Sequence, residues 1–220
     1  MTTFATMKTR IVDETLRDDL TPAQLGHAIN DAIALQEGER YSFNVRRYRI
    51  LTVAAQEYYD IKAPALLTSA GTAVGTGETL LELDSITTTV SNRPYPLTPR
   101  TQQWMDEQQD SNFLGQPADY TIYGQQLRIF PVPDAAYPID LSGLARLAPN
   151  PLSQDAHTNA WMTEGERLIR AQAKVLIYRD ILRDPDGVAL ATQQFGQAQL
   201  ALKRKMAAQA YTGHQRHRSL

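Results

Sequence analysis

The feature that most constrains the fold is an alternation of apolar and polar side chains over residues 119–141, in three short segments separated by turns. Tyr120 and Ile122 share a strand face in the first segment, and Leu127 and Ile129 share one in the second, because side chains two apart point to the same side of a strand. Two prolines end the second segment, since proline lacks the amide donor of a ladder. The alternation predicts a compact β meander with those four side chains in the core.

Other stretches upstream of this meander also have strand character. Residues 48–55 and 57–62 are rich in β-branched and aromatic side chains, which is typical of strands. Leu81 and Leu83 alternate with acidic residues, and this predicts a strand over 80–90.

Helical spacing marks both ends of the chain. Residues 8–19 predict a short helix, and Thr21 with Gln24 forms a capping-box pattern that predicts a second helix ending near Gly38. Two later apolar stripes predict two long antiparallel helices joined by a tight turn. The stripes consist of Leu168, Ala171, Val175, Tyr178 and Leu182, and of Val188, Ala191, Phe195, Ala198, Leu202 and Met206.

These patterns predict an α+β fold, namely an antiparallel helical bundle of two N-terminal and two C-terminal helices with an inserted small antiparallel β domain. We expect residues 1–40 and 155–212 to form the bundle, and residues 41–154 to form the β domain with one short helix. Residues 213–220 are expected to be a basic C-terminal tail.

Composition excludes several classes of protein. Apolar residues make up 42% of the chain, charged residues 21%, and the net charge is −2, which is too balanced to indicate a nucleic-acid-binding protein by bulk charge. The absence of cysteine excludes disulfides and cysteine-ligated metal sites. No apolar run approaches the roughly 18 residues of a membrane span, and the N-terminus has no hydrophobic signal core. We therefore expect neither membrane association nor export.

Charge is distributed unevenly along the chain. No acidic residue occurs from Val188 to Leu220, whereas five basic residues do, and the first forty residues hold seven acids against four bases. An acid-free chain end requires an acidic partner or nucleic acid, and because aromatic residues are not interleaved there, a protein partner is the better interpretation.

Candidate catalytic patterns are weak. The GTAVGTG stretch at 71–77 lacks the Lys-Ser/Thr ending of a phosphate loop and precedes a strand, so we interpret it as a surface loop. Asp155 and His157 are close enough in sequence for acid–base work, but no nucleophile or metal motif accompanies them. We expect no enzyme activity, no cofactor and no metal site.

Two basic clusters are candidate contacts for DNA or for an acidic partner, with a solvated surface as the alternative for each. Arg47 and Arg49 share a face of their predicted strand, next to Arg46. The second cluster lies on the helix face opposite the first apolar stripe and consists of Arg167, Arg170 and Lys174.

The order of several motifs resembles a known family. These motifs are GERYSFN (38–44), YYDI (58–61), LLELDSI (80–86), RPYPLTPRTQQWMD (93–106), the meander from residue 117, NAW (159–161) and LIRAQAKVLIYRDIL (168–182). Over residues 22–209 the chain resembles the head–tail connector adaptor proteins of tailed bacteriophages.

The resemblance implies a structural virion protein of the neck, assembled in the host cytoplasm, that forms a twelve-fold homo-oligomeric ring on the portal protein. Such a ring joins capsid to tail, receives the next tail or neck component and surrounds genomic DNA non-specifically during packaging and ejection. It also implies that the C-terminal segment docks on the portal through Tyr211, His214, Arg216, His217, Arg218 and Leu220. Arg46 and Arg47 depart from the family pattern, and a DNA-binding accessory protein that uses the basic strand and tail is the alternative.

Overall fold

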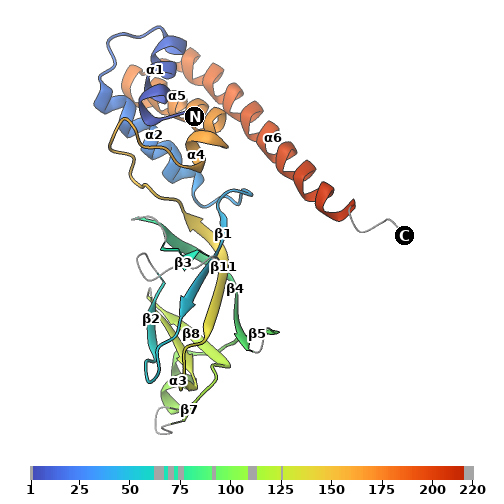
Figure 1. Cartoon of the computed structure of the whole chain (residues 1–220). Coiled ribbons are helices and arrows are strands. Elements are labelled where there is room, and N and C mark those ends of the chain that lie inside the picture. The colour runs from blue at the N-terminus through green and yellow to red at the C-terminus, as the bar shows by residue number, and fades with distance from the viewer. Residues whose placement is uncertain are drawn as a thin grey trace. The chain divides into compact units, whose positions relative to one another are not determined.

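The structure is a computed structural model that describes residues 2–61, 67–68, 72–73, 77–90, 93–108, 113–124 and 126–215, the last seven by backbone alone. The chain divides into two compact units (Figure 1). The helical unit comprises Met1–Asn44 and Pro149–Leu220, and the β unit is the continuous segment Val45–Ala148. The helical unit is therefore built from both ends of the chain.

The helical unit contains five α-helices and one π-helical turn. These are α1 (Phe4–Thr15), α2 (Pro22–Gln36), α4 (Ala160–Thr163), α5 (Glu166–Leu176), η1 (the π-helical turn Ile177–Leu182) and α6 (Pro185–Gln215). The predicted capping box is confirmed, because the Thr21 side chain accepts from the Gln24 amide while the Gln24 side chain accepts from the Thr21 amide. The predicted helix over 8–19 begins and ends four residues earlier, where Leu16 adopts the left-handed conformation that closes α1.

The core of the helical unit joins its two chain segments. Trp161 is fully buried and meets the rings of Tyr41 and Phe43 edge-on, at centroid distances of 5.5 and 4.9 Å. Ile11 and Ile29 from the N-terminal helices are also fully buried. This apolar packing lets residues from positions 4–44 and 152–202 stabilise one another.

The described residues of the β unit form three sheets and one short helix. The five-stranded sheet has the order β3 (Leu67–Thr68), β1 (Val45–Leu51), β11 (Pro138–Arg146), β4 (Thr79–Val90), β5 (Arg93–Pro96). The four-stranded sheet has the order β2 (Tyr58–Asp60), β9 (Gln126–Phe130), β8 (Asp119–Tyr123), β6 (Thr98–Pro99). The two-stranded sheet pairs β10 (Val132–Pro133) with β7 (Leu114–Gly115), and the helix is α3 (Gln102–Glu107).

The segment 119–141 is not a single meander. β8 and β9 pair antiparallel as neighbours, but β11 leaves them and pairs with β1 and β4 in the other sheet. Leu127 and Ile129 are fully buried, whereas Tyr120 and Ile122 are only half-buried. The third alternating segment, β11, therefore pairs with strands that lie far away in the sequence. Hydrophobic periodicity alone does not predict which strands pair.

The burial of β4 departs from simple alternation. Leu80, Ile86 and Thr88 are buried, while Leu81 is exposed. Its register against β11 shifts twice, between Ser142 and Gly143 and between Leu144 and Ala145. Each irregularity changes which side chains face the core, so the predicted strand exists but its inward face differs along its length.

The predicted helical bundle with a small inserted β domain is wrong. The structure is a mixed α+β protein with extensive antiparallel sheets, and its described residues form eleven strands and six α-helices. Six of those strands have four residues or fewer and include proline- or glycine-containing pairs that leave no alternation to detect, for example β7 and β10. The two long C-terminal helices that the apolar stripes predict are present, because α5 continues directly into η1 and ends at Leu182, and α6 begins after a short turn at Pro185 and packs against α5.

Candidate functional site

The basic strand cluster is organised around one buried carboxylate. Asp140 on β11 lies beside β1, where Arg49 Nε donates to Asp140 Oδ1 at 2.8 Å and Arg47 Nη2 donates to Oδ2 at 3.0 Å. Burial alone would raise the pKa of Asp140, but the hydrogen bonds and charges of the two arginines outweigh it and lower that pKa. The side chains of Arg47 and Arg49 are therefore both engaged by a carboxylate of their own unit.

Arg46 lies on the other face of β1. Its neighbours on that face are Tyr48 and Ile50, which are buried, whereas Arg46 itself is exposed. Burial and a hydrogen bond to Glu78 raise the pKa of Tyr48 far above its ordinary value. The alternation of β1 thus separates the three arginines, and only Arg46 points away from Asp140.

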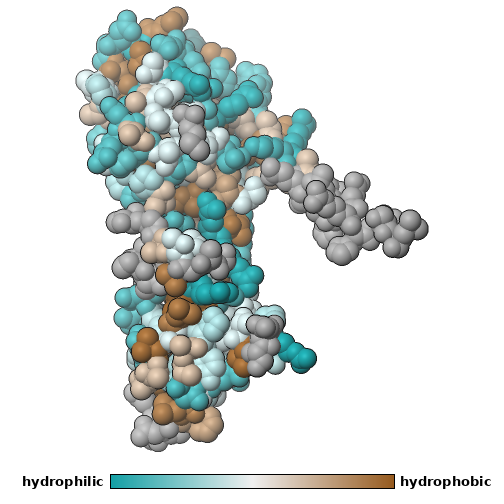
Figure 2. Space-filling model, in the orientation of Figure 1, coloured by the Kyte–Doolittle hydropathy of each residue, from teal (hydrophilic) through white to brown (hydrophobic). Residues whose placement is uncertain are grey.

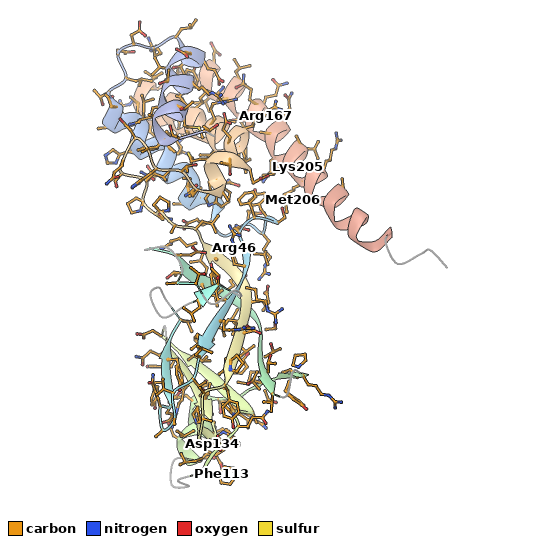
Figure 3. The ribbon with its side chains drawn as sticks, viewed as in Figure 1. Arg46, Phe113, Asp134, Arg167, Lys205 and Met206 are labelled. Atoms are coloured by element: carbon orange, nitrogen blue, oxygen red, sulfur yellow. The ribbon has the colours of Figure 1, made fainter. Side chains whose placement is uncertain are left out.

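The second basic cluster forms part of a polar cleft in the helical unit. Arg167, which belongs to this cluster, is labelled in Figure 3. Lys174 is buried, and its ammonium group donates to Glu14 at 2.8 Å and to Gln194 at 2.6 Å. Arg170 pairs with Glu14 at 3.0 Å and with Glu166 at 2.6 Å. Helices α1, α5 and α6 are thereby connected through charged groups, so the expectation that this helix face is merely solvated does not hold for Arg170 and Lys174.

Glu166 is a second acidic centre of the same region. Arg10 and Thr2 donate to its carboxylate as well as Arg170. Burial would raise the pKa of Glu166, but these hydrogen bonds and the charges of Arg10 and Arg170 outweigh it and lower that pKa.

Arg167 differs from its two neighbours on α5. It is exposed and makes no ion pair or hydrogen bond with any residue that the structure describes. It lines a cleft of about 400 Å³ with Glu14, Arg170, Ala171, Lys174, Gln194, Gln197 and Ala198. It also lines an adjoining cleft of about 320 Å³ that extends along α5 and α6 to Glu164 and Lys205. Three cations against one acid surround the first cleft.

The predicted docking residues of the C-terminal tail lie near or beyond the last residue that the structure describes, Gln215. Helix α6 continues to Gln215 and so contains Tyr211 and His214, whose side chains are outside the description. Arg216, His217, Arg218 and Leu220 lie outside the described residues altogether. The helix thus reaches further than the expected boundary at residue 213.

The weak catalytic candidates have structural partners. Asp155 pairs with Lys8 at 2.5 Å, and His157 Nδ1 accepts the backbone N–H groups of Ser153 and Gln154. Within the described ranges no group of three acidic or histidine side chains is arranged to hold a metal ion. Of the GTAVGTG stretch, only Thr72, Ala73 and Gly77 lie within the described residues.

Sequence reasoning missed the acidic partners of both clusters, Asp140 and Glu14. Asp140 occupies a buried position in a strand where alternation predicts only an apolar or a polar face. Glu14 is on a helix 160 residues from Lys174. Neither pairing has a local sequence signal, because both depend on which elements become neighbours.

The β unit also exposes apolar side chains. Phe113 and Leu114 are more than half exposed, and Phe113 lies 6.5 Å from the ring of Phe130. Figure 2 shows hydrophobic side chains gathered in patches over the lower part of the β unit, whereas hydrophilic side chains dominate much of the helical unit in that view. Exposed apolar patches of this kind mark surfaces that bind other proteins.

The described residues thus combine ion pairs that link elements within each unit with apolar side chains exposed on the β unit. The family model of the SU10 adaptor proteins matches residues 2–218, and the chain therefore belongs to the SU10 adaptor protein family. It is a structural adaptor protein of a bacteriophage and a component of the virion. No curated protein matches it. Among the described residues, no helix is both long and apolar enough to cross a membrane.

Proposed function

We propose that this protein is a head–tail connector adaptor that forms a ring on the portal protein, extends the DNA channel and receives the next tail or neck component. Family membership supports the adaptor role. The observation that carries the finer proposal is helix α6, which runs for 31 residues without any acidic side chain after Asp186. Figure 1 shows its C-terminal part extending away from the other helices of its unit.

The C-terminal segment is the proposed portal contact. Lys203 and Lys205 already pair with Glu39 and Glu164, at 3.7 and 2.7 Å. We propose that the cations beyond Gln215 in the sequence, Arg216 and Arg218, meet an acidic surface of the portal, and in a ring the same weak contact recurs in every subunit. Tyr211, His214, Arg216, His217, Arg218 and Leu220 are the proposed docking residues.

The proposal is tested by deleting residues 213–220. We expect the truncated protein to keep its helical and strand content by circular dichroism but to lose co-sedimentation with portal-containing heads. The matched control is the full-length chain with Arg216→Gln and Arg218→Gln, which retains the length but removes two charges. Binding that is lost on deletion and weakened by the substitutions supports docking, and normal co-sedimentation of the deleted chain contradicts it.

The DNA-binding alternative receives little support from the β unit. Asp140 engages Arg47 and Arg49, and Arg46 is the member of that cluster that forms no ion pair with a described residue. We therefore propose only non-specific contact with channel DNA. Direct binding of the isolated protein to duplex DNA should be weak even at low salt, whereas a steep dependence of affinity on salt would favour the alternative.

A further inference from the structure

The groove along helices α5 and α6 has the features of a docking site for another protein segment. Its two clefts share Arg167 and Ala198, so they form one continuous depression. Small side chains that allow close approach lie along it, namely Ala171, Ala198 and Ala201. Arg167 stands where the two clefts join, exposed and without a partner in the described part of the chain.

A surface of opposite character lies at the turn between α1 and α2. Leu16 is 86% exposed and holds a φ of 52°, a conformation that costs a leucine roughly 1 kcal/mol or more. Asp13 and Asp18 flank it, are exposed, and pair with no described residue. The backbone conformation of Leu16 closes α1, since its N–H donates to the Val12 carbonyl, but its apolar side chain remains exposed between two acids that pair with no described residue.

These two surfaces belong to different sides of the helical unit. Glu14 lines the α5–α6 groove, whereas Val12 and Asp18 line a separate depression with Lys8 and Asp155. Residues 12 and 14 point about 200° apart around a helix. The α1–α2 turn therefore does not occupy the groove of its own chain.

We infer that the α1–α2 turn of one subunit docks in the α5–α6 groove of a second copy of this chain. Leu16 would lie against the alanines, and Asp13 and Asp18 would approach Arg167. The opposite charges and the pairing of a projecting leucine with a small-residue groove identify this occupant. The two surfaces differ, so the contact is head-to-tail and extends from copy to copy until a ring closes. The inference rests on the proposed ring for the number of copies and supplies its contact.

The absence of cysteine from the chain makes a direct test possible. A double variant with Arg17→Cys and Gln197→Cys places one thiol on the turn and one in the groove, and it leaves Leu16 in place. We expect a short bismaleimide reagent to yield a ladder of covalent oligomers beyond the dimer. The matched control pairs Arg17→Cys with Gly196→Cys, an exposed position about 100° away around α6 that faces open space. The control should yield no ladder.

Charge reversal tests the specificity of the contact. Arg167→Glu in the double-cysteine chain should reduce the ladder at least tenfold, and adding Asp13→Arg and Asp18→Arg should restore it. Circular dichroism confirms that each variant is folded. Rescue by the opposite reversal supports the proposed pairing, whereas loss without rescue, in a folded chain, overturns it.

The same reaction on assembled particles separates this inference from the proposed function. If particles contain the double-cysteine protein but no ladder forms there or with concentrated free protein, the contact is overturned while the connector role stands. If the protein is absent from particles yet forms the ladder when free, the contact stands and the connector role is contradicted.

Discussion

Two carboxylates, Asp140 and Glu14, control the basic clusters of this protein. Each lies on a different element from the cations it holds, and each joins two cationic side chains. Asp140 is buried and stabilises the β unit only as long as it remains ionised, because breaking a buried pair leaves an uncompensated charge. The stability of the β unit should therefore depend on Asp140 and on pH, and that of the helical unit should depend on the partner that Glu14 provides for the buried Lys174.

The substitution Asp140→Asn should destabilise the β unit. It removes the charge that Arg47 and Arg49 share, and we expect a loss of about 2–4 kcal/mol in the free energy of unfolding at neutral pH. Urea denaturation followed by circular dichroism measures the loss. Arg46→Gln is the control, because Arg46 lies on the opposite face of β1, and it should have almost no effect.

The same substitution predicts a pH dependence. The pKa of Asp140 is lowered in the folded protein, so its stabilising contribution is complete above the ordinary aspartate value and is lost as pH falls through the lowered pKa. The difference between wild type and Asp140→Asn should therefore be constant near neutral pH and shrink below about pH 4. A difference that grows on acidification would contradict this assignment.

The substitution Glu14→Gln should destabilise the helical unit, because it leaves the buried ammonium group of Lys174 without its acidic partner. The lysine would keep Gln194 but lose its acidic partner, and Arg170 would keep only Glu166. We expect a loss of about 1–3 kcal/mol in unfolding free energy. Combining Glu14→Gln with Lys174→Met should cost less than the sum of the single substitutions, because the buried charge is removed together with its partner.

At the scale of elements, local sequence signals predicted that a helix or strand exists better than they predicted which elements it packs or pairs with. The Thr21 capping box and the apolar stripe of α2 placed that helix within two residues of its end. By contrast, the assignment of β11 to the sheet of β1 and β4, and the π-helical geometry of η1, have no local signature. Gly143 illustrates the difference, since only the structure shows why that position is glycine.

Gly143→Ala should disrupt the pairing of β11 with β4. An added Cβ would lie 1.9 Å from the Glu82 carbonyl oxygen, so the backbone of one strand must move. We expect a loss of about 2–4 kcal/mol in unfolding free energy, comparable to strongly overpacked cores. Gly196→Ala provides the contrast, because a Cβ there meets nothing within 4 Å and helix propensity favours alanine by about 1 kcal/mol. Thermal unfolding should shift in opposite directions for the two variants.

At the scale of the whole molecule, the insertion of one unit into another sets what each needs in order to fold. The β unit is continuous from Val45 to Ala148 and has its own core, which includes Leu127, Ile129 and Ile139. The helical unit depends on segments far apart in sequence. Composition and hydrophobic periodicity indicated a mixed α+β chain. They underestimated the extent of the β-sheets, because the shortest strands are too short to show an alternating pattern.

Each unit should fold when produced separately. Residues 45–148 alone should show cooperative thermal unfolding and a strand-rich circular dichroism spectrum, because their sheets pair among themselves. For the helical unit, a short Gly-Ser linker replaces the β unit between Asn44 and Pro149, and a helical spectrum with cooperative unfolding is expected. A non-cooperative transition for either piece would show that the two units stabilise each other.

The register of β1 against β11 gives the molecule an unusual response to mechanical load. Val45 pairs with Leu144, so the strands that enter and leave the β unit are hydrogen-bonded neighbours. Tension between the two units is carried by two covalent connections at once, and each bears part of the force. If force separates β1 from β11, the chain still joins the two units through both strands. The two strands therefore stay close enough to re-form their hydrogen bonds.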